Sequence, residues 1–249
     1  MSVMTRSIEG ITERDIAKAI DHSLLRPELD DEFVEAGCRL AAEYDVASVC
    51  VRPADVRRAR AILDGTDVKV GTVIGFPHGN HLTSTKVFEA RQALADGATE
   101  LDMVIQIGAL KSGRDADVQA DIAAIVEVAH AGGAIVKVIF ENAYLTDDEK
   151  IRACHLTEAA GADFVKTSTG FAPGGATHDD LRLMRANTSP HVQVKAAGGV
   201  RTLDALLDVM ALGTSRIGAT ATKAIIDDFR ARKSGAHAAP AAAATEGGY

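Results

Sequence analysis

The chain has 249 residues, of which 47% are hydrophobic, and a formal net charge of −8. This is enough for one sizeable core, and the acidic balance without a long basic run argues against a general affinity for nucleic acid or acidic membranes. The three cysteines form no CxxC pair, which favours a reducing cytoplasm, and no apolar run approaches the roughly 20 residues that a membrane-spanning helix needs.

Short apolar, β-branched runs alternate with longer amphipathic segments along the chain. A short helix is expected at about 12–18. Apolar residues at helical spacing predict further helices over 84–96, 115–131 and 146–160. In the last of these, Thr146 and Glu149 form a predicted capping box, and Gly161 follows the expected end. The apolar runs predict eight strands, over 19–24, 46–51, 68–76, 99–105, 134–141, 163–167, 191–195 and 214–218.

Eight strands alternating with helices over about 250 residues are what a (β/α)8 TIM barrel requires. We therefore expect residues 1–233 to form a single barrel domain. A doubly wound open sheet is the alternative, because periodicity alone does not reveal whether a sheet closes. Residues 234–249 are rich in Ala and Gly and have no apolar periodicity, which predicts a flexible C-terminal tail.

Charged residues lie inside four of the predicted strands. Lys166 ends the run Phe164-Val165-Lys166, and Lys195 stands in the same position of the next strand, 29 residues later. Asp102 and Lys137 lie within two earlier strands. Both faces of a parallel barrel strand are buried, so charges there need a reason. If the four side chains point inward, they form one cluster near the active-site end of the barrel.

Such a cluster suits amine chemistry. Desolvation and a neighbouring ammonium both lower the pKa of a lysine, and the neutral amine attacks carbonyls. Lys166 is the predicted nucleophile, Lys195 the neighbour that lowers its pKa, and Asp102 a group that offsets charge and relays protons. A lone lysine at a strand end is more often a solvated terminus or an ion-pair partner, and Lys137 is either such a structural charge or one that orients a substrate.

Glycine-rich segments follow the last three predicted strands. Loops after strands 7 and 8 of a barrel commonly bind phosphate through backbone N–H groups and a helix N-terminus. A single glycine is more often a turn residue, but the coincidence with lysine-bearing strands favours a phosphate site. There is no Walker or GxGxxG pattern, so no nucleotide cofactor is indicated. The residues concerned are Thr169, Gly170, Gly198, Gly199, Gly218 and Thr220.

Metal binding is weakly indicated. The eight histidines show no HxxxH or HExxH spacing. His78 and His81 are the one close pair, and a surface loop is the better interpretation. Cys50 ends the second predicted strand and either lines the pocket or acts as a small buried hydrophobe.

These residues stand in segments that resemble the DeoC-type deoxyribose-phosphate aldolases over nearly the whole chain. The two most specific segments are Val165-Lys166-Thr167-Ser168-Thr169-Gly170-Phe171 and Lys195-Ala196-Ala197-Gly198-Gly199-Val200-Arg201-Thr202. The others are DHSLL at 21–25, VGTVIGFPHG at 70–79, ELDMV at 100–104 and VKVI at 136–139.

The resemblance implies a class I aldolase without metal or other cofactor. Such an enzyme reversibly cleaves 2-deoxy-D-ribose 5-phosphate into acetaldehyde and D-glyceraldehyde 3-phosphate in deoxynucleoside catabolism. Lys166 would form the Schiff base, and Lys195 and Asp102 would transfer protons. A homodimer is the default expectation for closed symmetry. Substrate binding would fall to Asp21, Ser23, Cys50, Lys137 and Thr169, and phosphate binding to Gly170, Gly198, Gly199, Gly218 and Thr220.

The chain departs from the family pattern in several places. Thr220 and Ala221 stand where two serines are common, Ser23 replaces a threonine, and Asn142 follows Glu141 where threonine is usual. Tyr249 ends the chain, and some relatives fold such a tyrosine back toward the site. Two alternatives stay open: another barrel enzyme with a Schiff-base lysine, such as a transaldolase-like or fructose-phosphate aldolase, and a non-catalytic phosphate-binding barrel.

Overall fold

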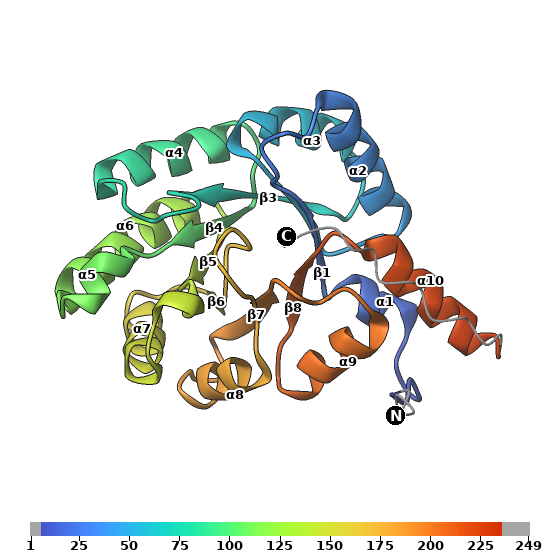
Figure 1. Cartoon of the computed structure of the whole chain (residues 1–249). Coiled ribbons are helices and arrows are strands. Elements are labelled where there is room, and N and C mark those ends of the chain that lie inside the picture. Colours follow the sequence, from blue (N-terminus) through green and yellow to red (C-terminus); the bar gives the residue numbers. More distant parts are fainter. Residues whose placement is uncertain (1–5, 236–249) are drawn as a thin grey trace.

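The computed structural model describes residues 6–235. Its eight strands are parallel and form a closed barrel in which each strand pairs with its neighbours in sequence and β8 returns to β1. Figure 1 shows the strands at the centre with the helices around them. The barrel prediction is confirmed, and the open-sheet alternative is wrong. The strands are β1 (Ile20–Leu24), β2 (Ser48–Val51), β3 (Lys69–Ile74), β4 (Glu100–Val104), β5 (Ile135–Ile139), β6 (Phe164–Lys166), β7 (Gln193–Ala197) and β8 (Arg216–Ala219).

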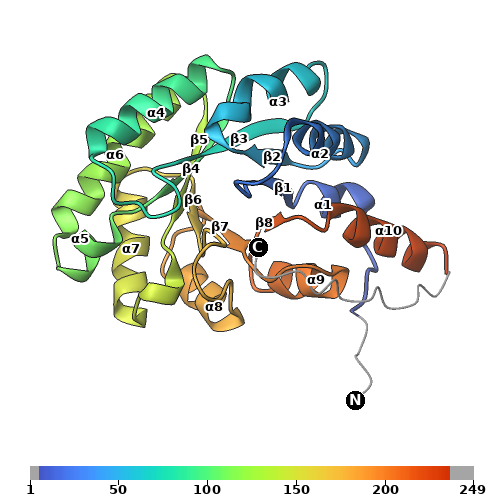
Figure 2. The same ribbon diagram turned by 45° about the horizontal axis from the view of Figure 1, so that its top comes forward.

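Helices form the outer layer around the strands (Figures 1 and 2). The short N-terminal helix packs against the last helix, and an ion pair between Arg230 and Glu13 joins them. The helices are α1 (Glu13–Ala17), α2 (Asp31–Glu43), α3 (Val56–Ile62), α4 (Thr83–Ala95), α5 (Ile107–Lys111), α6 (Asp115–Ala131), α7 (Asp147–Ala159), α8 (His178–Ala186), α9 (Leu203–Ala211) and α10 (Thr222–Lys233), with 3-10 turns η1 (Pro53–Asp55) and η2 (Asn142–Tyr144).

Local sequence signals place helix ends well. The helix predicted over 115–131 is α6. In α7 the capping box forms as expected, since the Thr146 side chain accepts from the Glu149 N–H and the Glu149 carboxylate accepts from the Thr146 N–H. Gly161 follows with φ +78, and the N–H groups of Gly161 and Ala162 bond to the carbonyls of Glu158 and Thr157. This pair of bonds is a Schellman motif, which satisfies the last carbonyls of the helix.

Some strands end at other residues than predicted, because backbone pairing or a backbone turn, and not hydrophobicity, sets the end of the strand. The strand expected over 191–195 continues to Ala197, because Ala197 pairs with Gly218 across the β7–β8 ladder. The strand expected over 68–76 stops at Ile74, since Gly75 turns with φ +62. The strand expected over 134–141 stops at Ile139, and Glu141 adopts a left-handed φ of 59.

The apolar core lies between the barrel and its helices. Side chains alternate across each strand, so Leu101, Val136, Val165 and Val194 face outward into one large cluster with the helices. Burying each such side chain contributes about 1.5–3 kcal/mol. The residues between them, with the opposite orientation, form the inner wall of the barrel, which is strongly charged.

The boundary of the barrel domain stays a prediction. The last described helix ends at Lys233, and residues 236–249, which hold most of the expected tail and Tyr249, lie outside the described residues. Across residues 6–235, none of the helices is both long and apolar enough to cross a membrane.

Candidate active site

The strand register brings the predicted residues to the same face of neighbouring strands, inside the barrel. Asp102 of β4 is paired with Lys137 of β5, and Lys166 of β6 is paired with Lys195 of β7. Paired residues of neighbouring parallel strands project to the same face. The four side chains therefore meet inside the barrel, as predicted, and each is at most 2% exposed.

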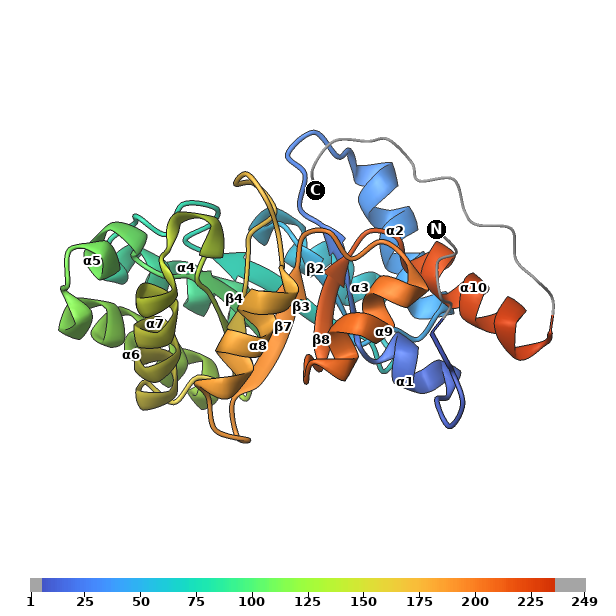
Figure 3. The same cartoon turned by 60° about the horizontal axis from the view of Figure 1, so that its bottom comes forward.

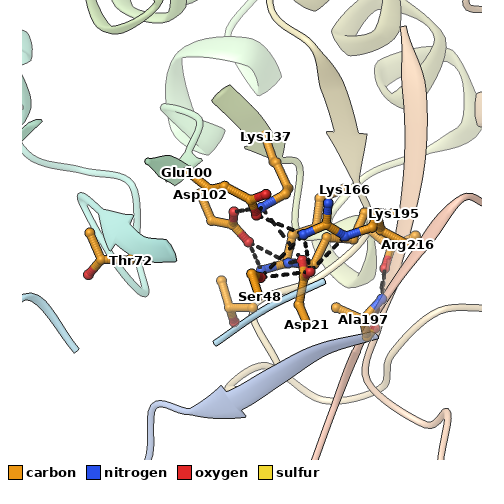
Figure 4. Close-up of polar contacts among 12 residues, drawn as sticks. Asp21, Ser48, Thr72, Glu100, Asp102, Lys137, Lys166, Lys195, Ala197 and Arg216 are labelled. Carbon is orange, nitrogen blue, oxygen red and sulfur yellow. Dashed lines mark hydrogen bonds and ion pairs between the residues drawn. The ribbon is translucent and has the colours of Figure 1, made fainter. Parts of the chain in front are cut away.

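Asp102 lies at the centre of this group (Figure 4). Its Oδ2 atom is 2.7 Å from Nζ of Lys166 and 2.7 Å from Nζ of Lys195, and its Oδ1 atom is 2.9 Å from Nζ of Lys137. Burial disfavours the charged carboxylate, but the three ammonium groups outweigh it and hold the pKa of Asp102 well below its usual range. Asp102 is thus an ionised acceptor for all three lysines.

Asp21 of β1 is the second carboxylate. Its Oδ2 atom lies 2.5 Å from Nζ of Lys195 and 3.5 Å from Nζ of Lys137. Its Oδ1 atom accepts from the Ser48 hydroxyl at 2.8 Å and from the Arg216 guanidinium. Burial opposes its ionisation, yet Arg216, Lys137 and Lys195 together lower its pKa. Asp21 therefore contacts Lys195 through one carboxylate oxygen, and Ser48 and Arg216 through the other.

A deeper layer holds Lys137, Glu100 and Arg216. Nζ of Lys137 is 2.6 Å from Oε2 of Glu100, and Nη2 of Arg216 is 2.8 Å from the same atom. Despite the desolvation that acts against it, the pKa of Lys137 is raised, because Asp102, Asp21 and Glu100 surround it. Lys137 is therefore a cation held by three carboxylates, which favours a structural role for it over contact with a substrate.

Sequence reasoning missed Glu100 and Arg216. Both lie in predicted strands and two residues from a predicted site residue, Asp102 and Gly218 respectively. The two-residue period of a strand places them on the same inward face, so this spacing was the signal that could have found them.

The ion-paired cluster carries more positive than negative charge. Four cations, Lys137, Lys166, Lys195 and Arg216, meet three carboxylates. The carboxylates are Asp21, Glu100 and Asp102. With all seven groups ionised, the set has a net charge of +1, because four positive charges meet three negative ones. Buried net charge is costly.

Three other predicted residues lie around this cluster. Ser23 and Cys50 are buried partners in the β1–β2 register. Cys50 packs with Leu25, Val73 and Phe76 in a small apolar group apart from the main core. Burial, followed by the charge of Asp102, raises the pKa of the Cys50 thiol to about 11. Thr169 is fully buried after β6 and bonds to Glu141.

Four of the five predicted phosphate residues lie at one cavity between the ends of β7 and β8. Gly198, Gly199, Gly218 and Thr220 line it, with Arg201 at the same site. Gly170 is not among the lining residues, so the structure does not bring it to this cavity. Glycines leave the backbone N–H groups accessible to an anion, and α10 starts two residues after Thr220.

Among residues 6–235, no group of three or more His, Cys, Asp or Glu side chains is arranged to hold a metal ion. His78 and His81 are both exposed, as the surface-loop interpretation predicts.

Fold and buried amine–carboxylate cluster together define the class of the protein, which is a single-domain (β/α)8-barrel enzyme. Residues 15–233 match the family model of DeoC/LacD family aldolases. The chain belongs to this family, and so it is a lyase of the aldolase type.

Relatives and solved structures agree with this assignment. A deoxyribose-phosphate aldolase of Rhodopirellula baltica is 51% identical over 216 residues, which are 87% of this chain and 90% of that protein. The crystal structure of a putative deoxyribose-phosphate aldolase from Coccidioides immitis has 42% identity and a TM-score of 0.85, with 88% of this chain and 87% of that one covered. A tetrameric deoxyribose phosphate aldolase from Aeropyrum pernix has 30% identity and a TM-score of 0.82, covering 89% and 93%.

Proposed function

We propose that this chain reversibly cleaves 2-deoxy-D-ribose 5-phosphate into acetaldehyde and D-glyceraldehyde 3-phosphate through an imine on Lys166. The observation that carries the proposal is the shared Asp102 Oδ2 atom, 2.7 Å from Nζ of both Lys166 and Lys195. One carboxylate oxygen placed between two buried amines lets one amine attack while its neighbour holds the proton. The names of the relatives support the same substrate.

The proposed steps balance without an outside reagent. The neutral Lys166 amine adds to the C1 aldehyde of the open-chain sugar. The resulting hydroxyl takes a proton from the Lys195 ammonium and leaves as water, which gives a protonated imine. The C3 hydroxyl then gives its proton to the Lys195–Asp102 pair, and the C2–C3 bond breaks. C3 leaves as the aldehyde carbon of D-glyceraldehyde 3-phosphate, and the electron pair of the broken bond moves into the imine to form an enamine. Protonation of C2 and addition of water release acetaldehyde and restore the amine. The protonated imine supplies the electron sink that a metal provides in other aldolases.

Lys195 and Asp102 are the proposed proton carriers for the C3 hydroxyl and for C2. Nζ of Lys195 donates a hydrogen bond to Oδ2 of Asp102 at 2.7 Å, and Nζ of Lys166 donates to the same oxygen at 2.7 Å. A proton can therefore pass between the two lysines through one carboxylate oxygen. Ser23 and Thr169 supply hydroxyls for the sugar, and Asp21 keeps Lys195 in place.

The proposed phosphate site is the glycine-lined cavity beside β7 and β8. Backbone N–H groups near Gly198 and Gly218, the start of α10 and the cationic Arg201 all favour an anion there. Thr220 keeps one hydroxyl, and Ala221 supplies none. Gly170 is proposed to shape the loop after β6, where its φ of +90 suits glycine.

Borohydride trapping tests the function. Incubation with acetaldehyde and sodium borohydride is expected to place an ethyl group on Lys166, located by peptide mapping. Labelling of another residue, or no labelling, would overturn the assignment. A comparison of acetaldehyde with dihydroxyacetone as the donor substrate distinguishes this function from that of the other Schiff-base aldolases. Full activity in the presence of EDTA is also expected for this mechanism.

We also propose a homodimer in a reducing cytoplasm, with a role in deoxynucleoside catabolism. The three cysteines are free and buried, which suits that compartment. Analytical ultracentrifugation measures the assembly state, and a stable monomer or tetramer would replace the dimer.

A further inference from the structure

Glu141 is a buried carboxyl that the proposed mechanism does not use. It follows β5, is 2% exposed and has φ 59. A left-handed conformation costs a non-glycine residue about 1–2 kcal/mol. Neighbouring backbone bonds hold it there, because Phe140 N–H donates to the Lys166 carbonyl and Asn142 N–H donates to the Thr167 carbonyl, each at 3.0 Å. The turn at Glu141 is thus tied to the strand that carries Lys166.

The strained turn directs the carboxylate at Thr169. The Thr169 backbone N–H donates to both carboxylate oxygens, at 3.2 and 3.3 Å, and the Thr169 hydroxyl donates to Oε2. The Phe171 N–H donates to the same hydroxyl oxygen at 3.0 Å. A threonine hydroxyl has one proton and two lone pairs. Its proton and one lone pair are therefore already committed, and one lone pair remains.

This arrangement lies beside the reactive lysine. Burial raises the pKa of Glu141, while the hydrogen bonds from Thr169 and then the charges of Lys166 and His78 act in the opposite direction. The loop after β6 also packs Phe171 edge-on against Phe76, with ring centroids 5.3 Å apart. Figure 3 shows this loop, between β6 and α8, rising from the barrel. Glu141 binds Thr169, near the start of this loop, through the hydrogen bonds given above.

We propose that Glu141 is a positioning residue that fixes the Thr169 hydroxyl as a hydrogen-bond acceptor, so that the site selects acceptor aldehydes with a hydroxyl next to the carbonyl carbon. If the Thr169 hydroxyl could rotate freely, it would donate to a substrate or accept from it equally well. Because its proton is donated to the Glu141 carboxylate, it can only accept, and it therefore binds a substrate that offers an O–H donor. A site built to bond a substrate hydroxyl discriminates strongly against the analogue that lacks it. The inference rests on the proposed aldol function.

Two variants separate this role from a merely structural one. Glu141→Gly removes the carboxylate and relieves the backbone strain, since glycine accepts positive φ. Glu141→Gln keeps an oxygen that can accept from the Thr169 hydroxyl. Glu149→Ala is the matched control, because Glu149 also accepts from a threonine N–H, that of Thr146, but on the outer helix α7.

The measurement compares two acceptors in aldol addition of acetaldehyde: D-glyceraldehyde 3-phosphate and the same phosphorylated aldehyde without its 2-hydroxyl. For Glu141→Gly we expect kcat/KM to fall about 10–100-fold with the hydroxylated acceptor and to change little with the deoxy acceptor. Glu141→Gln is expected to restore most of the preference, and Glu149→Ala to leave it unchanged.

An equal loss with both acceptors would show a structural role and overturn the inference. Loss of preference in Glu141→Gln as severe as in Glu141→Gly would also overturn it, as would wild-type preference in Glu141→Gly. Borohydride trapping of acetaldehyde on Lys166 is measured in each protein. Failure of trapping in the wild type counts against the proposed function, whereas trapping with unchanged acceptor preference counts against Glu141 alone.

Discussion

Lys166 and Lys195 contact the same oxygen, Oδ2 of Asp102, but in the described structure their ion pairing is unequal. Lys195 has a second carboxylate, Asp21, at 2.5 Å, whereas Lys166 is ion-paired to Asp102 at 2.7 Å without a second carboxylate. Neutralising Lys166 therefore sacrifices one ion pair, and neutralising Lys195 sacrifices two. Of the two buried amines, Lys166 therefore has fewer carboxylate contacts to break when it reacts.

This asymmetry predicts different outcomes for two leucine substitutions. Lys166→Leu should abolish borohydride-trapped acetaldehyde, because the nucleophile is gone. Lys195→Leu should still form the adduct on Lys166, more slowly, while turnover falls about 10²–10⁴-fold, the usual contribution of proton transfer by a positioned group. Intact-mass measurement of the adduct checks both, and an adduct that persists in Lys166→Leu would reverse the assignment.

Arg216 should be essential for stability. Its guanidinium contacts Asp21 and Glu100, and its side chain is 13% exposed. Arg216→Met leaves two buried carboxylates short of a partner, so we expect the free energy of unfolding to fall by about 3–5 kcal/mol. Arg14→Met is the matched control, since Arg14 also pairs with two aspartates but is 64% exposed, and it should cost at most about 1 kcal/mol. Urea unfolding curves compare them, and equal losses would contradict the prediction.

His22 should make the fold less stable in mild acid. It is buried in β1, its Nδ1 atom lies 2.9 Å from the Thr222 hydroxyl, and burial lowers its pKa from 6.5 to about 4. Between these values the unfolded chain binds the proton and the folded chain does not, so stability falls as pH drops from 6.5 toward 4, by up to about 3 kcal/mol.

His22→Gln should remove that slope. Asp21 and Asp102, whose pKa values are lowered in the fold, stabilise the protein above their unfolded pKa near 4 and lose this effect below it. Their contribution therefore falls at lower pH than that of His22. Denaturant titrations at several pH values from 4.5 to 7.5 test this prediction, and an unchanged slope in His22→Gln would refute it.

Gly175 should control phosphate binding. A Cβ there would lie 2.4 Å from the Gly198 carbonyl oxygen, and Ala176 N–H bonds to the Ala197 and Gly198 carbonyls at 3.0 Å. Gly175→Ala must push the Gly198 loop, which lines the proposed phosphate cavity. We expect KM for 2-deoxy-D-ribose 5-phosphate to rise about 10-fold, which corresponds to about 1.4 kcal/mol, while acetaldehyde trapping on Lys166 persists.

Gly108→Ala is the control for Gly175→Ala. It lies in α5 with no atom within 4 Å of its added Cβ, so it should leave KM unchanged and stabilise the fold by up to about 1 kcal/mol. An unchanged KM in Gly175→Ala would contradict the prediction, because it would show that a shift of the Gly198 loop does not weaken binding of the phosphate.

Much of this molecule could be predicted from its sequence because the relevant signals are local. The alternation of strands and helices, the capping box of Thr146 and Glu149, and the lysines inside apolar strands all depend on neighbouring residues. The two-residue period of a strand places Asp102 on the opposite face from Leu101, and Lys166 on the opposite face from Val165. Residue types therefore predicted alternating strands and helices with lysines inside the strands, and the family resemblance supplied the expected substrate.

What the tertiary structure decided depends on distances between strands far apart in the chain. Closure of the barrel brings Asp21 to Arg216, 195 positions away, and also to Lys195. Lys195 thereby has a second carboxylate, which Lys166 lacks. Neither the shared Asp102 oxygen nor the left-handed turn of Glu141 has a sequence signal, since both arise from packing around the closed ring. The sequence by itself determined which residues of a strand share a face, and the fold decided which charged groups form ion pairs, because electrostatic coupling depends on distances of a few ångströms.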